Sequence, residues 1–161
     1  MRFCKLMGLA LLLSLGGCGG EQGGSGAEPS KPLLTAATLG EQTLRSNDEW
    51  LAMAPYATAD MKKGEQQAML CMACHSLQSG GATMIGPNLY GFFGSKVASR
   101  EDFSYTAALN EADFYWTPRA LDAWLEQPAK FLPGNMMSFP GVRKQQDRDN
   151  LIAYLLEVTG E

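Results

Sequence analysis

The sequence predicts an all-α fold of three to five short helices, and three observations support that prediction. Asp60 can cap a helix over residues 61–70. A Thr-Pro start signal precedes a second helix over residues 118–126, which ends just before another proline. Residues 147–158 carry leucine and isoleucine at helical spacing, which indicates an amphipathic third helix.

The composition of the whole chain is that of a globular domain with additional segments. Its 161 residues are 45% hydrophobic and 19% charged, with a formal net charge of −4. A nucleic-acid partner would favour a basic face, so this charge argues against one. No apolar run reaches the roughly 18 residues of a membrane-spanning helix.

Residues 1–17 predict a secretory signal peptide. Arg2 and Lys5 give a basic start, residues 6–15 are apolar, and small residues follow. The Leu-Gly-Gly before Cys18 resembles the lipobox of bacterial lipoproteins, in which the cysteine is lipidated and becomes the mature N-terminus. Ordinary signal cleavage nearby and an uncleaved short anchor are the alternatives.

Residues 18–58 predict a lipidated N-terminus followed by a flexible or partly helical tether. Residues 19–34 are rich in Gly, Ser, Pro and Glu, a composition typical of flexible linkers. The run SNDE at 46–49 could cap a short helix. Residues 35–58 are therefore either a small docking segment or a partly ordered extension, and we expect the extension. The main domain is predicted to occupy residues 59–161.

The helix predicted over residues 61–70 leads into the sequence CMACH at 71–75. The spacing Cys-x-x-Cys-His is the signature for covalent attachment of haem c. Two thiols three residues apart can add to the two vinyl groups of one macrocycle, and the adjacent histidine then faces the iron as its proximal ligand. Cys71, Cys74 and His75 are therefore predicted to hold one covalent haem.

Other interpretations of this motif have less support. A structural zinc site needs four ligands, and His75 is the single histidine of the chain. A thioredoxin-type redox pair would lie in a βαβ pattern and be followed by a helix. Here residues 76–88 are loop-like and no strand pattern precedes the motif. A plain disulfide between the two cysteines remains as an alternative.

A haem that carries electrons rapidly needs a second axial ligand. With no second histidine, a lysine or a methionine must serve. The stretch PGNMMSFPG at 133–141 places Met136 and Met137 between two Pro-Gly pairs, where turn residues predict an irregular loop. Methionine is a soft thioether donor, and Met/His ligation raises the reduction potential.

Residues 60–159 resemble the class I c-type cytochromes, the soluble mitochondrial and bacterial carriers. The resemblance rests on CMACH at 71–75, GPNLYGFFGSK at 86–96, FSYTAAL at 103–109, WTPRALDAWLEQP at 116–128, AKFLPGNMMSFPG at 129–141 and DRDNLIAYL at 147–155. It implies the cytochrome c fold, in which the helix before CMACH crosses the C-terminal helix and short helices wrap around one covalently bound haem.

The resemblance also implies residue roles. The Pro87 carbonyl accepts the imidazole N–H of His75, which fixes the tautomer. In the family's P-G-x-x-M loop the ligand lies four residues after the proline, which selects Met137 over Met136. The residues implied to bind haem are Cys71, Cys74, His75, Pro87, Tyr105, Trp116, Trp124 and Met137, with His75 and Met137 on the metal.

Three of these positions concern the haem periphery. Tyr105 and Trp116 correspond to a pair that hydrogen-bonds a buried propionate, and Trp124 replaces a tyrosine close to the axial methionine. Ser95 stands where an arginine often supports a propionate. That charge is therefore either uncompensated or met by Arg100.

Two filled axial positions predict an electron-transfer protein, not an enzyme. Together with Cys18, the resemblance implies a lipid-anchored mono-haem cytochrome on the periplasmic side of a bacterial membrane. It would carry single electrons in a respiratory chain, from a bc-type complex or a dehydrogenase to a terminal oxidase. The alternatives are a dedicated redox subunit of a periplasmic dehydrogenase or reductase, docked through residues 35–58, and a haem-ligand sensor or peroxidase-like protein whose methionine leaves readily.

The charge balance of the domain predicts weak electrostatic steering. From Asp60 onward the chain holds nine Lys/Arg against twelve Asp/Glu. Met136 falls where relatives often carry a surface lysine, so it is either part of the rim where partners dock or simply an exposed apolar residue. We expect partner reduction to depend less on salt than for a basic cytochrome.

Overall fold

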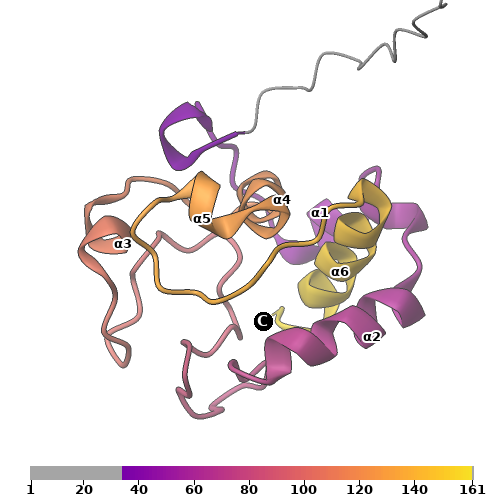
Figure 1. Cartoon of the computed structure of the whole chain (residues 1–161). Helices are drawn as coiled ribbons and strands as arrows, with labels where there is room; N and C mark the ends of the chain where they lie inside the picture. The colour runs from indigo at the N-terminus through magenta and orange to yellow at the C-terminus, as the bar shows by residue number, and fades with distance from the viewer. Residues whose placement is uncertain (1–33, 161) are drawn as a thin grey trace, which may run out of the picture. The chain divides into compact units, whose positions relative to one another are not determined.

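Helices form the regular structure of residues 34–160, the part of the chain that this computed structural model describes (Figure 1). They are η1 Ala36–Thr38, α1 Asn47–Leu51, η2 Tyr56–Thr58, α2 Met61–Met72, α3 Ala107–Glu111, α4 Pro118–Glu126, α5 Pro128–Phe131 and α6 Gln145–Val158. Within these residues the β pairing is one isolated antiparallel bridge, between Lys96 and Tyr115. The predicted all-α class is confirmed, with one α-helix more than the range predicted.

The predictions that concern the start of the chain fall outside the described part. These are the signal peptide at 1–17, the lipidation of Cys18 and the Gly-rich beginning of the tether. Among residues 34–160, no helix is both long and apolar enough to cross a membrane.

Local capping explains where the predicted helices begin. The Asp60 carboxylate accepts a hydrogen bond from the Lys63 N–H at 3.1 Å, and α2 then continues two residues past its predicted end. At α4 the Thr117 hydroxyl accepts from the Ala120 N–H at 3.2 Å, as the Thr-Pro signal predicts. α6 begins at Gln145, two residues earlier than predicted, and no side chain caps its start.

Two short α-helices were not predicted. Thr106 caps α3 by accepting a hydrogen bond from the Leu109 N–H, a local signal that could have been identified in the sequence. Pro128, interpreted as a stop signal for α4, is also the first residue of α5. Proline suits that position because its missing N–H would have no partner there.

Residues 34–58, here called the N-terminal arm, pack against the rest of the domain. The Ser46 hydroxyl accepts from the Glu49 N–H and starts α1 at Asn47. Leu39 and Trp50 are only 1% and 6% exposed. Burying each such side chain stabilises the fold by about 1.5–3 kcal/mol, so this part of the predicted tether is held in place.

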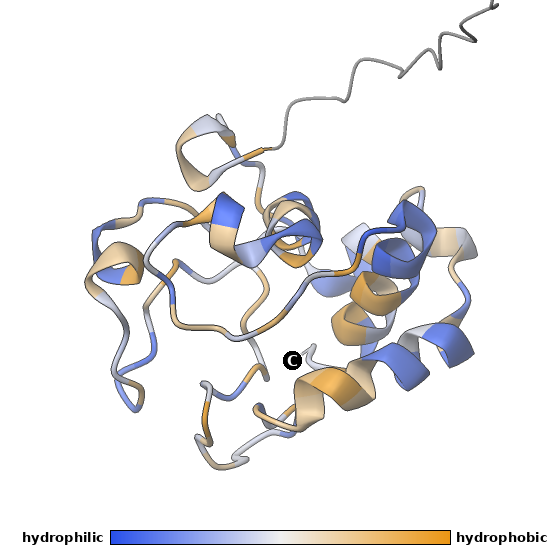
Figure 2. Ribbon diagram, viewed as in Figure 1, coloured by the Kyte–Doolittle hydropathy of each residue, from blue (hydrophilic) through white to orange (hydrophobic). Residues whose placement is uncertain are grey.

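α2 packs closely along α6, as the predicted crossing requires (Figure 1). A Cβ atom on Gly64 would lie 2.2 Å from the Asn150 carbonyl oxygen and 2.7 Å from the Tyr154 Cβ. Only glycine therefore permits this approach of the two helices. The Asn150 side chain also accepts a hydrogen bond from the Asp60 N–H at 2.9 Å. Figure 2 shows that both helices are polar in their first turns and apolar in their last.

Candidate functional site

The two cysteines lie where α2 ends. Cys71 is in the last turn of the helix and Cys74 follows it, and both carry free, partly buried thiols. The His75 N–H donates to the Cys71 carbonyl at 2.9 Å, which keeps the motif in a helical turn. Burial raises the pKa of the Cys71 thiol to about 11. The disulfide alternative is not what the structure shows.

A zinc alternative also has no support in the geometry. Residues 34–160 contain no cluster of three or more His, Cys, Asp and Glu side chains that could hold a metal ion. The motif therefore lacks the additional protein ligands that a structural zinc site requires.

The His75 imidazole is fixed by two neighbours. Its Nδ1 donates to the Pro87 carbonyl at 2.7 Å, which leaves Nε2 with its lone pair available. Burial lowers the pKa of His75, while the Pro87 carbonyl acts in the opposite direction. A Cβ atom on Gly86 would lie 2.3 Å from the ring carbon Cε1, so the ring rests against a position that only glycine can fill.

Residues 133–141, here called the strap, are shaped by one asparagine. The Asn135 amide donates to the carbonyls of Pro128 at 2.9 Å and Leu132 at 2.7 Å. Its side-chain oxygen accepts from the Met137 N–H at 3.0 Å. Asn135 therefore links the backbone of Met137 to α5 and the residue that follows it.

The end of the strap is fixed on α4. Gly141 has a φ of +91°, and a Cβ atom there would lie 2.3 Å from the Glu126 carbonyl oxygen. The next residue, Val142, donates its N–H to the Leu125 carbonyl at 2.7 Å. Both ends of the strap are thus attached to the α4–α5 segment.

The two methionines of the strap have different environments. Trp124 Nε1 donates to Met137 Sδ at 3.2 Å, and Met137 is partly buried against the core. Met136 is 84% exposed. A thioether sulfur has two lone pairs, so Met137 can accept from Trp124 and still bind iron through the other.

A cluster of four aromatic rings holds Trp124. Trp116, Phe114, Phe131 and Trp124 form a closed circuit of edge-to-face contacts with ring centroids 4.9–5.8 Å apart. Such pairs each stabilise by about 0.5–1.5 kcal/mol beyond the area they bury. Sequence reasoning missed Phe114 and Phe131, although the run FYW at 114–116 was a visible signal.

Tyr105 and Trp116 have separate surroundings. The Tyr105 ring lies 4.9 Å from Phe103, whereas Trp116 belongs to the four-ring cluster. Burial raises the pKa of Tyr105, and the nearby Arg100 opposes that shift. Arg100 donates to the Tyr90 carbonyl. The joint role of Tyr105 and Trp116 at a propionate remains a prediction.

The donor set of these residues fits a covalently attached haem. Two free thiols stand at the required spacing, and the imidazole of His75 has one nitrogen fixed by Pro87 and the other available. The strap presents a partly buried thioether, and the side-chain oxygen of Gln67 is buried without a partner among the described residues.

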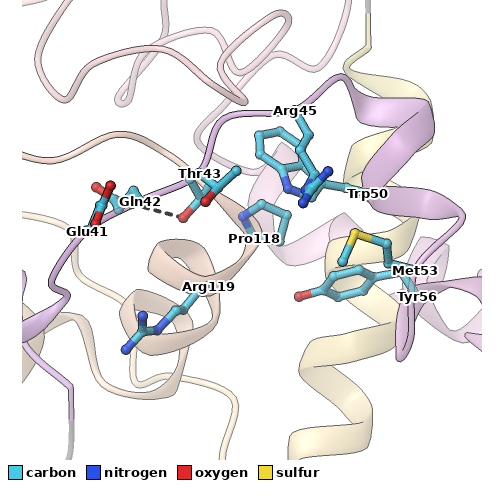
Figure 3. Close-up of a pocket in the computed structure, with 10 residues that line it drawn as sticks. Glu41, Gln42, Thr43, Arg45, Trp50, Met53, Tyr56, Pro118 and Arg119 are labelled. Carbon is cyan, nitrogen blue, oxygen red and sulfur yellow. Dashed lines mark hydrogen bonds between the residues drawn. The ribbon is translucent and has the colours of Figure 1, made fainter.

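The groove drawn in Figure 3 is a separate feature. It has a volume of about 350 Å³ and lies between the N-terminal arm and the start of α4. Arg45, Trp50, Met53 and Tyr56 line its arm side, and Arg119 lies opposite (Figure 3). None of the sequence-predicted haem residues borders it.

Gln42, at the edge of this groove, forms hydrogen bonds with the residues on both sides of Trp116. Its amide donates to the Tyr115 carbonyl at 2.7 Å and to the Thr117 hydroxyl at 2.9 Å, the second drawn dashed in Figure 3. Its side-chain oxygen accepts from the Tyr115 N–H at 2.8 Å. Sequence reasoning did not identify Gln42, because no local pattern connects it to a segment so far along the chain.

The sequence of this chain is similar to those of known cytochromes c. The family model for cytochrome c matches residues 61–159. Cytochrome c from Kluyveromyces lactis is 35% identical over 105 residues, which are 65% of this chain and 96% of that protein. Cytochrome c from Gibberella zeae is 40% identical over 104 residues, 64% of this chain and 98% of that protein. The Arabidopsis thaliana cytochrome c is 41% identical over 101 residues, covering 62% and 90% of the two chains.

Proposed function

This chain belongs to the cytochrome c family, and we propose from that premise that it carries single electrons on one haem c bonded to Cys71 and Cys74. His75 and Met137 are the axial ligands in this proposal. Family membership makes the protein an electron carrier, not an enzyme. The single observation that supports the ligand assignment best is the hydrogen bond from Trp124 to Met137 Sδ at 3.2 Å.

The protein residues hold the proposed axial ligands of a centre that gains and loses one electron. When bound, the haem supplies that redox centre, whose potential depends on its axial ligands and surroundings. Pro87 holds His75 in the tautomer that leaves Nε2 available. Asn135 and Trp124 hold Met137 at its backbone and its sulfur. Fixed ligands keep the structural change between the two oxidation states small.

These contacts favour an electron carrier over the alternatives. A sensor or peroxidase-like protein needs a methionine that leaves readily, whereas Met137 is held at two atoms. A dedicated redox subunit docked through residues 35–58 would need that segment to be available. Leu39 and Trp50 are instead buried within the chain's own domain.

For the location, we propose a lipid anchor at Cys18 on the periplasmic side of a bacterial membrane. The signal-like residues 1–17 and the lipobox-like sequence before Cys18 support this proposal. The tether would hold the domain near a bc-type complex or dehydrogenase and a terminal oxidase. Tethering raises the effective concentration of the domain at such partners.

Substitution of each strap methionine tests the ligand assignment. The ferric holoprotein should show the weak red absorption band of methionine–iron ligation. We expect Met137→Ala to abolish this band, because the iron loses its sulfur ligand, and Met136→Ala to retain it, because Met136 is exposed. The measurement is the visible spectrum of each ferric variant.

The same spectra can contradict the proposal in two ways. A band that survives in Met137→Ala would show that another residue ligates the iron. A high-spin spectrum in the unsubstituted protein would favour the peroxidase-like alternative.

A further inference from the structure

The segments that carry the predicted haem ligands contain no formal charge apart from His75. Residues 66–95 include no Asp, Glu, Lys or Arg, and they contain both cysteines and the histidine. Residues 131–142 are equally uncharged and contain Met137. In a chain that is 19% charged, these are the two longest uncharged runs after residue 20.

Large apolar side chains are exposed in the same two segments. Among residues 34–160, nine large apolar or aromatic residues are exposed, and six of them lie in these uncharged runs. The six, here called the apolar patch, are Met69 at 64%, Leu70 at 65%, Met72 at 42%, Met84 at 49%, Ile85 at 79% and Met136 at 84% exposure. Large exposed apolar patches on a protein typically mark interaction sites.

The haem itself does not account for the exposure of Met69 and Leu70. α2 buries the side that carries Gly64 and Ala68. At about 3.6 residues per turn, Met69 and Leu70 project away from that side. Figure 2 shows the apolar colouring of the C-terminal turns of α2. A cofactor that covered that buried side would therefore leave Met69 and Leu70 in solvent.

The apolar patch is attached to the ligand residues by the chain itself. Leu70 directly precedes Cys71, and Met136 directly precedes Met137. Ile85 precedes Gly86, against which the ring of His75 rests. Because one haem would join these three places, the apolar patch borders the point where an electron enters or leaves.

We propose that the apolar patch is the docking surface for a redox partner whose own contact surface is apolar and uncharged. This inference rests on the proposed function as an electron carrier. The cores of protein interfaces are depleted of charge, and charges lie at the rim. Lys130 and Arg143 stand just outside the uncharged strap segment, where rim charges are expected.

The step at this surface transfers one electron and forms no bond. The reduced protein is oxidised, and a one-electron centre in the partner is reduced. A charged partner surface would lose its hydration against the apolar patch without gaining an ion pair, which disfavours it. The patch therefore selects its partner by apolar contact.

Oxidation by respiratory membranes tests this docking surface. The probe is a preparation of oxidase-containing membranes from the organism that naturally makes this protein. Oxygen uptake is measured as a function of the concentration of reduced holoprotein. Leu70→Ser and Met136→Ser should each raise KM about tenfold with kcat unchanged, because each removes one apolar anchor. The matched controls are Leu44→Ser and Met53→Ser, which alter exposed apolar residues of the N-terminal arm and should retain the KM of the unsubstituted protein.

Salt gives an independent readout. Raising the ionic strength from about 0.01 M to about 0.15 M should change KM by less than about twofold, because apolar contacts are not screened. A steep rise of KM with salt would overturn the inference, since it would show that charge pairs dominate docking. The red absorption band of each variant confirms that the haem ligands are intact.

Other outcomes separate this inference from the proposed function. If the unsubstituted protein is not oxidised by the membranes, the proposed delivery of electrons to an oxidase fails. If it is oxidised and the two patch variants keep its KM, the docking inference alone is overturned. A dimer in sedimentation that Leu70→Ser disperses, with KM unchanged, would assign the patch to a second copy of the chain and also overturn it.

Discussion

At the scale of single residues, one hydrogen bond distinguishes the two neighbouring methionines. Trp124 donates its indole N–H to Met137 Sδ, while Met136 is exposed. In the proposed ligation of iron by Met137, donation to the sulfur withdraws electron density from it and weakens it as a ligand for the ferric state. Trp124 is therefore expected to raise the reduction potential, since a weaker donor favours the ferrous state.

Replacing Trp124 by phenylalanine tests this effect. Trp124→Phe keeps an aromatic ring but removes the N–H, so Met137 becomes a stronger donor. We expect the reduction potential to fall by about 40 mV. A hydrogen bond that favours the reduced state by about 1 kcal/mol corresponds to a shift of that size for a one-electron couple. The measurement is a spectroelectrochemical titration of the holoprotein.

Trp50→Phe is the matched control for that titration. Trp50 packs against Phe93 and is not among the residues implied to bind haem. Its substitution controls for the loss of an indole ring elsewhere in the core. A potential that rises in Trp124→Phe would contradict the expected direction.

The sequence predicted those residue contacts that follow from short motifs. The family resemblance at GPN implied that Pro87 lies beside His75, and the structure places Nδ1 2.7 Å from that carbonyl. Gln42 could not be found in this way. Its partners Tyr115 and Thr117 are far along the chain, and a lone glutamine carries no local signal.

At the scale of elements, the N-terminal arm is an integral part of the domain. α1 was predictable because its cap is formed by neighbouring residues, Ser46 and Glu49. The packing of α1 on the domain was not predictable, because its partners are distant in sequence. The ring centroids of Trp50 and Phe93 are 6.0 Å apart, and Asn47 donates to the Leu156 carbonyl at 2.7 Å. Such contacts depend on the completed fold, which local patterns do not encode.

Gln42 provides a test of how much the arm contributes. Gln42→Ala removes two hydrogen bonds with the backbone of Tyr115 and one with the hydroxyl of Thr117. We expect the free energy of unfolding to fall by about 2 kcal/mol, because two of the three bonds are solvent-exposed and each contributes modestly. The measurement is urea unfolding of the holoprotein.

Glu41→Ala is the matched control, since Glu41 is the exposed neighbour on the same arm. It should change the free energy of unfolding little. Equal stability of the Gln42→Ala and Glu41→Ala variants would mean that the arm rests on the domain without supporting it.

At the scale of the whole molecule, Arg148 connects α6 to α4 and to the residues just after the strap. It is 3% exposed and lies 2.7 Å from the Asp122 carboxylate of α4. The same guanidinium donates to the carbonyls of Val142 at 2.8 Å and Arg143 at 3.0 Å, just beyond the strap. The haem site is thus supported by a buried cation from α6. The sequence predicted this helix only from its apolar spacing, so it did not indicate the role of Arg148.

Lipid attachment is a property of the whole chain, and it can be tested by substitution of one cysteine. Cys18→Ala removes the predicted lipidation site, so we expect the protein to move from the membrane to the soluble fraction with its haem spectrum unchanged. The measurement is fractionation of cells, followed by mass analysis of the mature N-terminus.

Cys4→Ala serves as the control, because Cys4 lies inside the predicted signal peptide and leaves with it. That variant should stay with the membrane. A Cys18→Ala protein that also stays there, with an intact signal segment in its mass, would favour the uncleaved anchor.

The close approach of Gly64 to Asn150 has a consequence for the order of events during biosynthesis. α2 emerges from the ribosome well before α6, because residues 73–144 lie between them. Until α6 is made, the bare surface at Gly64 has nothing to pack against. CMACH is therefore synthesised before α2 has the helix along which it packs. The last helix to be translated completes the domain.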